Sequence, residues 1–209
     1  MASIAVLSSL ALKGVLEEFK PSFERSLGAA LELRFDATQA ILKNLETVQA
    51  DLLVLTAEAM EELRNNGKVT QVRAIGSSGV GVAVRAGAPK PDIGSVENLK
   101  RVLTNAKSVA HSKVGASGIY FSELLDRLNI TLRKRIVVEK GPVGLVVASG
   151  EAEIGVQQLC ELAPVRGIDI VGPLPEAVQK LTWFAAGIPA AAKNPQGAAA
   201  LMELIPSLD

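Results

Sequence analysis

Apolar and polar positions alternate between two periodicities in the first third of this 209-residue chain. Short apolar runs are typical of buried strands, and apolar residues three and four positions apart predict amphipathic helices. We expect Pro21 to interrupt the first helix and Gly28 to end it. The predicted strands are residues 4–8, 31–35 and 50–56, and the predicted helices are residues 12–28, 38–46 and 57–67. This βαβαβα order is the pattern of a parallel sheet covered by helices on both faces.

The alternation restarts after a boundary rich in proline and glycine. The predicted strands there are residues 79–86, 108–112, 135–140, 153–158, 169–175 and 180–190, and the predicted helices are residues 96–106, 118–130, 142–151 and 195–208. Residues 180–190, like residues 79–86, have the pattern of a strand that leads into a loop. We therefore interpret the second set of strands and helices as inserted into the first set. The sequence therefore predicts an α/β protein with two Rossmann-like lobes, residues 1–82 with 184–209 and residues 83–183, joined by two hinge crossings. The alternative is a single doubly wound sheet.

Small hydroxyls, glycines and amides recur where the predicted strands end. They are Ser8, Ser9, Thr38, Thr56, Ser112, Gly115, Ser117, Gly118, Gly141, Gly144, Gln157 and Gln158. Ligands of open parallel sheets bind beyond the carboxyl ends of the strands, and helix starts there offer free N–H groups and a positive dipole end. Each residue type is also common in ordinary helix caps. Because such residues recur at the strand ends of both lobes, however, they favour a site for a small anion that is bound through neutral donors.

Composition excludes several classes of function. Basic and acidic residues number 22 each, so the net charge is zero, and aromatic residues are scarce. Both features argue against nucleic-acid binding. A single cysteine and a single histidine exclude an internal disulfide and a metal site built on those residues. We expect neither a metal nor a cofactor.

The remaining reactive residues each have a functional and a structural interpretation. His111 ends a predicted apolar strand and is either a packed histidine or a group that acts on the ligand. Cys160 is predicted to be a small buried residue, and Glu139 with Lys140 a solvated pair. The glycines before and within residues 79–86 lead into a strand rather than from a strand into a helix, which is the wrong order for a dinucleotide or phosphate loop.

The first twelve residues are mostly apolar and small, but they do not resemble a secretory signal. The first basic residue, Lys13, follows the apolar run instead of preceding it. No run approaches the roughly 18 apolar residues of a membrane span, so we expect no membrane insertion. The chain as given is expected to be cytoplasmic, or periplasmic if a signal has been removed from it.

Several segments together resemble the periplasmic molybdate-binding proteins of type 2 solute-binding fold. They are VLSSLALKGVLEEFKPSFERSLG (6–28), FDATQAILKNLETVQADLLVLTAEAMEEL (35–63), GVGVAVRAGAPKPDI (79–93), GASGIYFSELLDRLNI (115–130) and VVASGEAEIGVQQLCEL (146–162). The resemblance implies two lobes that close on an anion held in the cleft between them. Carried over by position, the ligand-binding residues are Ser8, Ser9, Thr38, Ser117, Gly118, Val143, Gln157 and Gln158.

Two departures from that family favour carboxylates over molybdate. The usual glycine- and serine-rich turn after the second strand is replaced by residues 36–39, which begin with Asp36, and Gln157-Gln158 replaces a late tyrosine. Some relatives of the family are similar to aconitate isomerases, which shift a proton within a small unsaturated tricarboxylate without a cofactor. The first hypothesis is therefore an anion-binding protein, read by an ABC transporter if the chain is exported. The second is such an isomerase, with His111, Glu139 and Lys140 as candidates for the acid or base.

Overall fold

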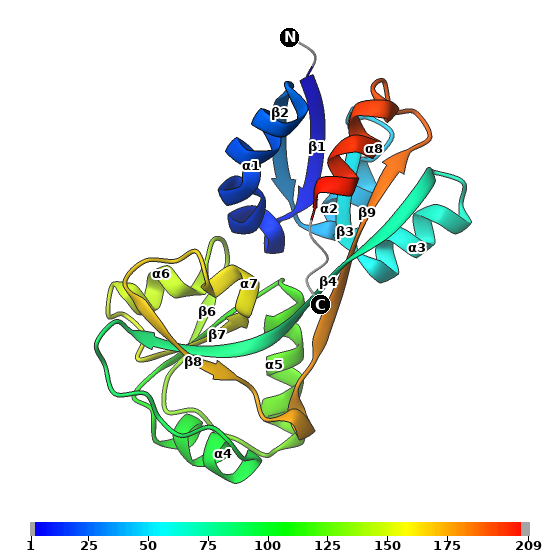
Figure 1. Cartoon of the computed structure of the whole chain (residues 1–209). Helices are drawn as coiled ribbons and strands as arrows, with labels where there is room; N and C mark the ends of the chain where they lie inside the picture. Colours follow the sequence, from blue (N-terminus) through cyan, green and yellow to red (C-terminus); the bar gives the residue numbers. More distant parts are fainter. Residues whose placement is uncertain (1–2, 206–209) are drawn as a thin grey trace. The chain divides into compact units, whose positions relative to one another are not determined.

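The computed structural model describes residues 3–205 and divides the chain into two compact units. Unit 1 contains Met1–Ser77 and Thr182–Asp209, and unit 2 contains Ser78–Leu181. Figure 1 shows the first and last segments of the described chain, coloured blue and red, in the same unit. Unit 2 is therefore an insertion into unit 1, and the chain passes between the two units twice.

Unit 1 is built on a sheet in the order β2-β1-β3-β9-β4. Its elements are β1 (Ser3–Ser9), the 3-10 turn η1 (Leu10–Leu12), α1 (Lys13–Leu27), β2 (Ala30–Asp36), α2 (Thr38–Asn44), β3 (Leu52–Thr56), α3 (Ala57–Asn65), the first part of β4 (Val69–Arg85), β9 (Leu181–Pro189) and α8 (Pro195–Leu204). β1 pairs in parallel with β2 and β3, whereas β9 pairs antiparallel with β3. The expected sheet is thus mixed rather than purely parallel.

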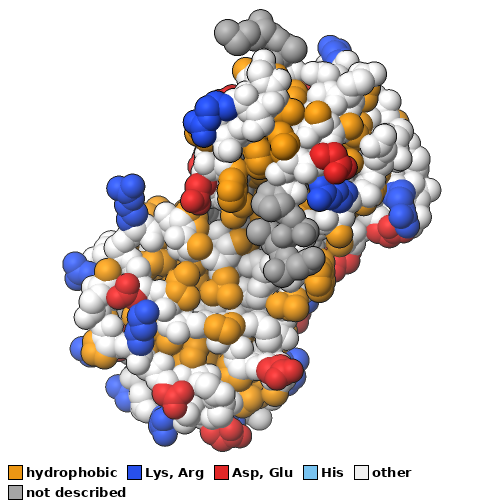
Figure 2. All heavy atoms as spheres, in the orientation of Figure 1, with side chains coloured by type: hydrophobic (Ala, Val, Ile, Leu, Met, Phe, Trp, Pro, Cys, Tyr) orange, Lys and Arg blue, Asp and Glu red, His pale blue; other side chains and the backbone are white. Residues whose placement is uncertain are grey.

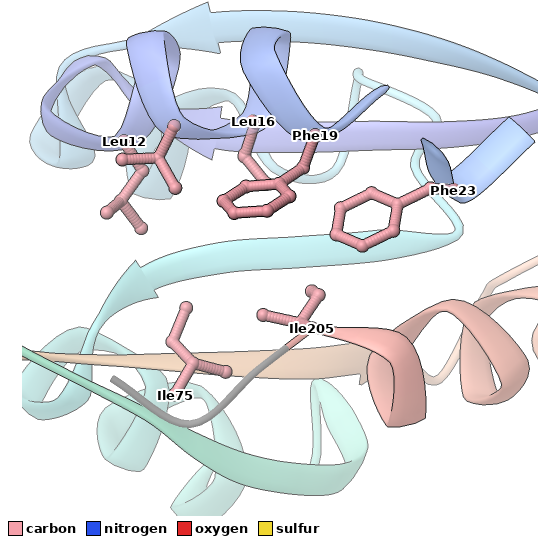
Figure 3. A pocket seen from close by; sticks show the side chains of 7 residues that line it. Leu12, Leu16, Phe19, Phe23, Ile75 and Ile205 are labelled. Atoms are coloured by element: carbon pink, nitrogen blue, oxygen red, sulfur yellow. The ribbon is translucent and has the colours of Figure 1, made fainter. Parts of the chain in front are cut away.

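Helix α1 packs its apolar side against other parts of unit 1. It runs unbroken through Pro21, which corrects the interruption expected there, and ends as expected at Gly28, whose φ of 60° is left-handed. The Phe19 and Phe23 rings stack with their centroids 5.8 Å apart. Figure 3 shows the α1 side chains pointing toward Ile75 of β4 and Ile205, around a small apolar pocket.

Unit 2 has a second mixed sheet, ordered β4-β7-β5-β6, with β8 on the other edge of β4. Its elements are the remainder of β4, α4 (Val96–Asn105), β5 (Val109–Ser112), α5 (Ala116–Arg127), β6 (Arg135–Val138), α6 (Val143–Ala148), β7 (Ile154–Gln158), α7 (Leu159–Leu162), β8 (Ile168–Pro173) and η2 (Glu176–Val178). β5 runs parallel to β6 and β7, and β4 runs antiparallel to β7 and β8. Three parallel strand ends therefore meet at one edge of this sheet.

Candidate functional site

The carboxyl ends of β6, β5 and β7 bring three predicted site segments together within unit 2. Ser112 on β5 pairs with Val138 on β6, and His111 pairs with Val156 on β7, so Gln157 follows on the same edge. The connections beyond these strands start α5, α6 and α7. Ligands of such sheets bind at this edge, because the free N–H groups of the helix starts are directed there.

The start of α5 lies unusually close to the end of β5. A Cβ atom at Gly118 would stand 1.9 Å from the Ser112 carbonyl oxygen, so only glycine allows this approach. The side chains of Ser112 and Ser117 are buried, and within residues 3–205 neither hydroxyl has a hydrogen-bond partner. Buried hydroxyls almost always have a partner. Two unsatisfied hydroxyls, one at the end of β5 and one in the first turn of the twelve-residue helix α5, are suited to a bound anion.

Gln157 links β7 to the start of α6. Its Oε1 accepts a hydrogen bond of 2.8 Å from the Val143 backbone N–H, and its side chain is buried. The Val143 N–H is therefore occupied in this structure, as is the Gly118 N–H, which donates to the Gly115 carbonyl at 2.9 Å. Gln158 is also buried and pairs with Val80 of β4. The structure thus brings Ser117, Gly118, Val143 and both glutamines to one edge of unit 2.

Glu161 is a titratable residue at this edge that the sequence analysis did not single out. It lies in α7, four residues after Gln157, and its carboxylate accepts hydrogen bonds from the Gln157 side chain and the Gln158 backbone N–H. Burial raises the pKa of Glu161 to about 7, although these two hydrogen bonds act in the opposite direction. The sequence contained one signal that could have identified Glu161. It is an acidic residue four positions after Gln157, an amide residue at the end of a predicted strand.

His111 is buried, and both of its ring nitrogens are hydrogen-bonded. Arg135 Nε donates to His111 Nε2 at 2.7 Å, and since the Ser112 carbonyl oxygen can only accept, His111 Nδ1 carries the proton in the 2.9 Å contact between them. Burial is the main cause that lowers the pKa of His111, and the positive charge of Arg135 adds to it. In this geometry His111 is a neutral residue that joins β5 to β6, with no nitrogen open to a ligand. Its catalytic role stays a prediction.

Other candidate residues have structural partners. Burial raises the pKa of Cys160 to about 11, which makes the thiolate scarce at neutral pH. Glu139 forms an exposed ion pair of 2.8 Å with Lys113 rather than with Lys140. Tyr120 donates to the Val178 carbonyl at 2.7 Å and is buried in the core. These contacts give Glu139 and Tyr120 structural roles and leave Cys160 as a thiol.

Unit 1 has its own strand-end hydroxyls. Ser8 and Ser9 end β1 and are both buried; the Ser8 hydroxyl donates to the Ser9 carbonyl at 3.1 Å, and the Ser9 hydroxyl has no partner among the described residues. Ser9 pairs in register with Asp36, and Thr38 is the first residue of α2. The Asp36 carboxylate accepts from the Ala37 N–H at 2.7 Å. Ser8, Ser9 and Thr38 therefore meet at one edge of the unit 1 sheet.

Other surfaces are less suited to an anion. The pocket of Figure 3 is lined by apolar side chains alone, namely those of Leu12, Val15, Leu16, Phe19, Phe23, Ile75 and Ile205. Figure 2 shows acidic and basic side chains scattered over the visible face of each unit, without a large patch of one sign. Among residues 3–205, His, Cys, Asp and Glu side chains form no cluster of three that could hold a metal ion. No helix within that range is long and apolar enough to cross a bilayer.

Comparison with known sequences gives two matches over most of the chain. The family described as bacterial extracellular solute-binding protein matches residues 4–209. An aconitate isomerase from Pseudomonas sp is 36% identical over 221 residues, a match that covers 100% of this chain and 84% of that protein.

Solved structures with the same fold include two oxyanion-binding proteins. The periplasmic molybdate-binding protein of Azotobacter vinelandii has a TM-score of 0.75 at 17% identity, covering 97% of this chain and 92% of its own. The tungstate-binding protein of Desulfovibrio alaskensis G20 has a TM-score of 0.64 at 14% identity, with coverages of 98% and 90%. The predicted type 2 periplasmic-binding-protein fold is confirmed.

Proposed function

Because this chain belongs to the bacterial extracellular solute-binding protein family, we propose that it uses that fold as an isomerase of a small unsaturated polycarboxylate such as aconitate. The observation that carries the proposal is the 36% identity, along the whole chain, to an aconitate isomerase. The resemblance to molybdate-binding proteins predicted from the sequence is confirmed at the level of the family. The isomerase, which was the second hypothesis from the sequence, is now preferred to the anion-binding protein.

The reaction needs donors for carboxylates and one group that moves a proton. A base removes a proton from the methylene carbon, whose C–H electrons form a new double bond, and the electrons of the old double bond take up a proton at the far carbon. Atoms and electrons balance without an oxidant, a reductant or a cofactor. Charge develops on the carboxylates during this shift, so donors fixed around them stabilise the transition state.

The chain supplies such donors at both sheet edges. In unit 2 they are the Ser112 and Ser117 hydroxyls and the start of α5, and in unit 1 the Ser9 hydroxyl. Neutral donors also suit a substrate that must be released after reaction, because no buried counter-charge holds it.

Incubation with cis-aconitate in D₂O tests the proposal. We expect conversion to the trans isomer with deuterium on the product, and stabilisation in thermal denaturation by cis- and trans-aconitate but not by molybdate or tungstate. Heat-treated protein is the control for spontaneous isomerisation. Stabilisation by aconitate without isomerisation or exchange would contradict the enzyme and favour the second candidate, an anion-binding protein, whose support is the shared fold with the molybdate-binding protein.

Replacing Ser117 with alanine separates a binding role from a structural one. Since the Ser117 hydroxyl is buried without a partner among residues 3–205, its removal should leave the ligand-free protein as stable as before, or up to about 1 kcal/mol more stable. Affinity for cis-aconitate, measured by calorimetry, should fall about tenfold because a hydrogen bond to the ligand is lost.

Ser122→Ala is the matched control for Ser117→Ala. The Ser122 hydroxyl donates to the Gly118 carbonyl at 2.9 Å and accepts from Arg135 at 2.5 Å. Its loss should therefore lower the free energy of unfolding by about 1 kcal/mol. A stability loss of that size for Ser117→Ala, with unchanged affinity, would argue against Ser117 as a ligand-binding residue.

A further inference from the structure

We propose that Glu161 is the group that moves the proton between the two carbons of the substrate, an inference that rests on the isomerase function proposed above. The residue lies in α7, directly beyond the carboxyl end of β7, at the same edge of unit 2 as the unsatisfied hydroxyls of Ser112 and Ser117.

The Glu161 carboxyl group is held by two donors. The Gln157 side-chain amide and the Gln158 backbone N–H both donate to it. Gln157 is itself held, because its Oε1 accepts from the Val143 N–H at 2.8 Å, which leaves its NH₂ group as the donor to Glu161. A carboxylate has about four lone-pair sites. Two donors therefore orient the Glu161 side chain and leave acceptor capacity for a proton from the substrate.

The packing of α7 against the sheet depends on Gly81 of β4. A Cβ atom at Gly81 would lie 2.2 Å from Leu159 Cδ2, so glycine lets the first residue of α7 pack onto the strand. The Cys160 N–H also donates to the Ser78 hydroxyl at 3.1 Å. Both contacts fix α7 within unit 2, and a fixed helix keeps the Glu161 carboxyl group in one place.

The surroundings of Glu161 contain few charges. The elements that make the main contacts with α7 are β7 and α6, and neither contains an acidic, basic or histidine residue. The titratable neighbour on α7 itself is Cys160, which stays a thiol at neutral pH because burial raises its pKa to about 11. Burial without a nearby cation is the condition that raises the pKa of a carboxyl group.

The chemistry requires one group that both accepts and donates a proton. With a pKa of about 7, Glu161 is present in both protonation states near neutral pH. In the ionised state it removes the methylene proton, and the acid thus formed exchanges its proton with solvent before it protonates the far carbon, so that deuterium enters the product in D₂O. A group with a pKa near the working pH is the most efficient in such a cycle.

The experiment compares Glu161→Gln with the matched control Glu151→Gln, an exposed carboxylate of the same unit. The rate of cis- to trans-aconitate conversion is followed by proton NMR, and binding by calorimetry. We expect Glu161→Gln to lower the rate by at least about a hundredfold while the dissociation constant changes by no more than about threefold. Glu151→Gln should match the wild type in both. Glu161→Asp should retain part of the activity with a displaced pH–rate profile.

Two results would overturn the inference, and they are distinguishable. If the wild type isomerises aconitate and Glu161→Gln is nearly as fast, Glu161 is not the proton-transfer group, although the proposed function stands. If the wild type neither isomerises aconitate nor exchanges deuterium, the proposed function fails and the role of Glu161 with it.

Discussion

Glutamine at position 161 is expected to raise the free energy of unfolding by about 3 kcal/mol at pH 8 and to leave it nearly unchanged at pH 4. Burial raises the pKa of Glu161 from 4.5 to about 7 in the folded protein, and each pKa unit corresponds to about 1.4 kcal/mol. Between pH 4.5 and about pH 7 the folded protein keeps the Glu161 proton that the unfolded chain releases. Stability therefore falls as the pH rises through this window, and glutamine, which does not titrate, removes that fall.

Urea unfolding followed by circular dichroism at several pH values measures this effect. The difference between Glu161→Gln and the wild type should grow from pH 4.5 to pH 7 and then level off. Glu151→Gln should show no such growth, because Glu151 is exposed. A difference that does not vary with pH would contradict a raised pKa, and this test is independent of any enzymatic activity.

Alanine at position 118 is expected to lower the free energy of unfolding by at least about 2 kcal/mol. The added methyl group would lie 1.9 Å from the Ser112 carbonyl oxygen and 2.5 Å from its hydroxyl oxygen. Since the nearest atom belongs to the backbone, α5 must move away from β5, and the gain in helix propensity of about 1 kcal/mol offsets only part of this cost.

Thermal and urea denaturation of Gly118→Ala beside Gly94→Ala measures that cost. Gly94 is exposed, and a Cβ atom there would meet only an Asp92 carboxylate oxygen, at 3.2 Å. We therefore expect Gly94→Ala to be close to the wild type. Equal stabilities of the two variants would show that α5 does not need its close approach to Ser112.

The alternation of elements and the strand-end residues were predictable because both follow from local patterns. Short apolar runs predicted β1 and β3, and the predicted hydroxyls lie where expected, with Ser8 and Ser9 at the end of β1 and Ser117 at the start of α5. Strand direction was not predictable in the same way. β4 and β9 pair antiparallel with their neighbours, and the partners of these strands are distant in sequence.

The site in unit 2 shows the limit of reading residue types alone. His111 attracted attention as the single histidine, yet Arg135, 24 positions away, occupies its Nε2 atom. Glu161 was not identified from the sequence, because its properties come from burial and from the hydrogen bond of Gln157. Both outcomes depend on contacts between segments, which periodicity and composition do not encode.

The insertion of unit 2 into unit 1 sets an order of events on the ribosome. All of Ser78–Leu181 leaves the exit tunnel before Thr182–Asp209 does, so the inserted unit can fold while its host is still incomplete. Until β9 emerges, the buried strand β3 has no partner on the side where Leu53 pairs with Gly187. An apolar strand edge left open during translation is prone to aggregation. The nascent chain is therefore most in need of a chaperone until β9 has emerged and paired with β3.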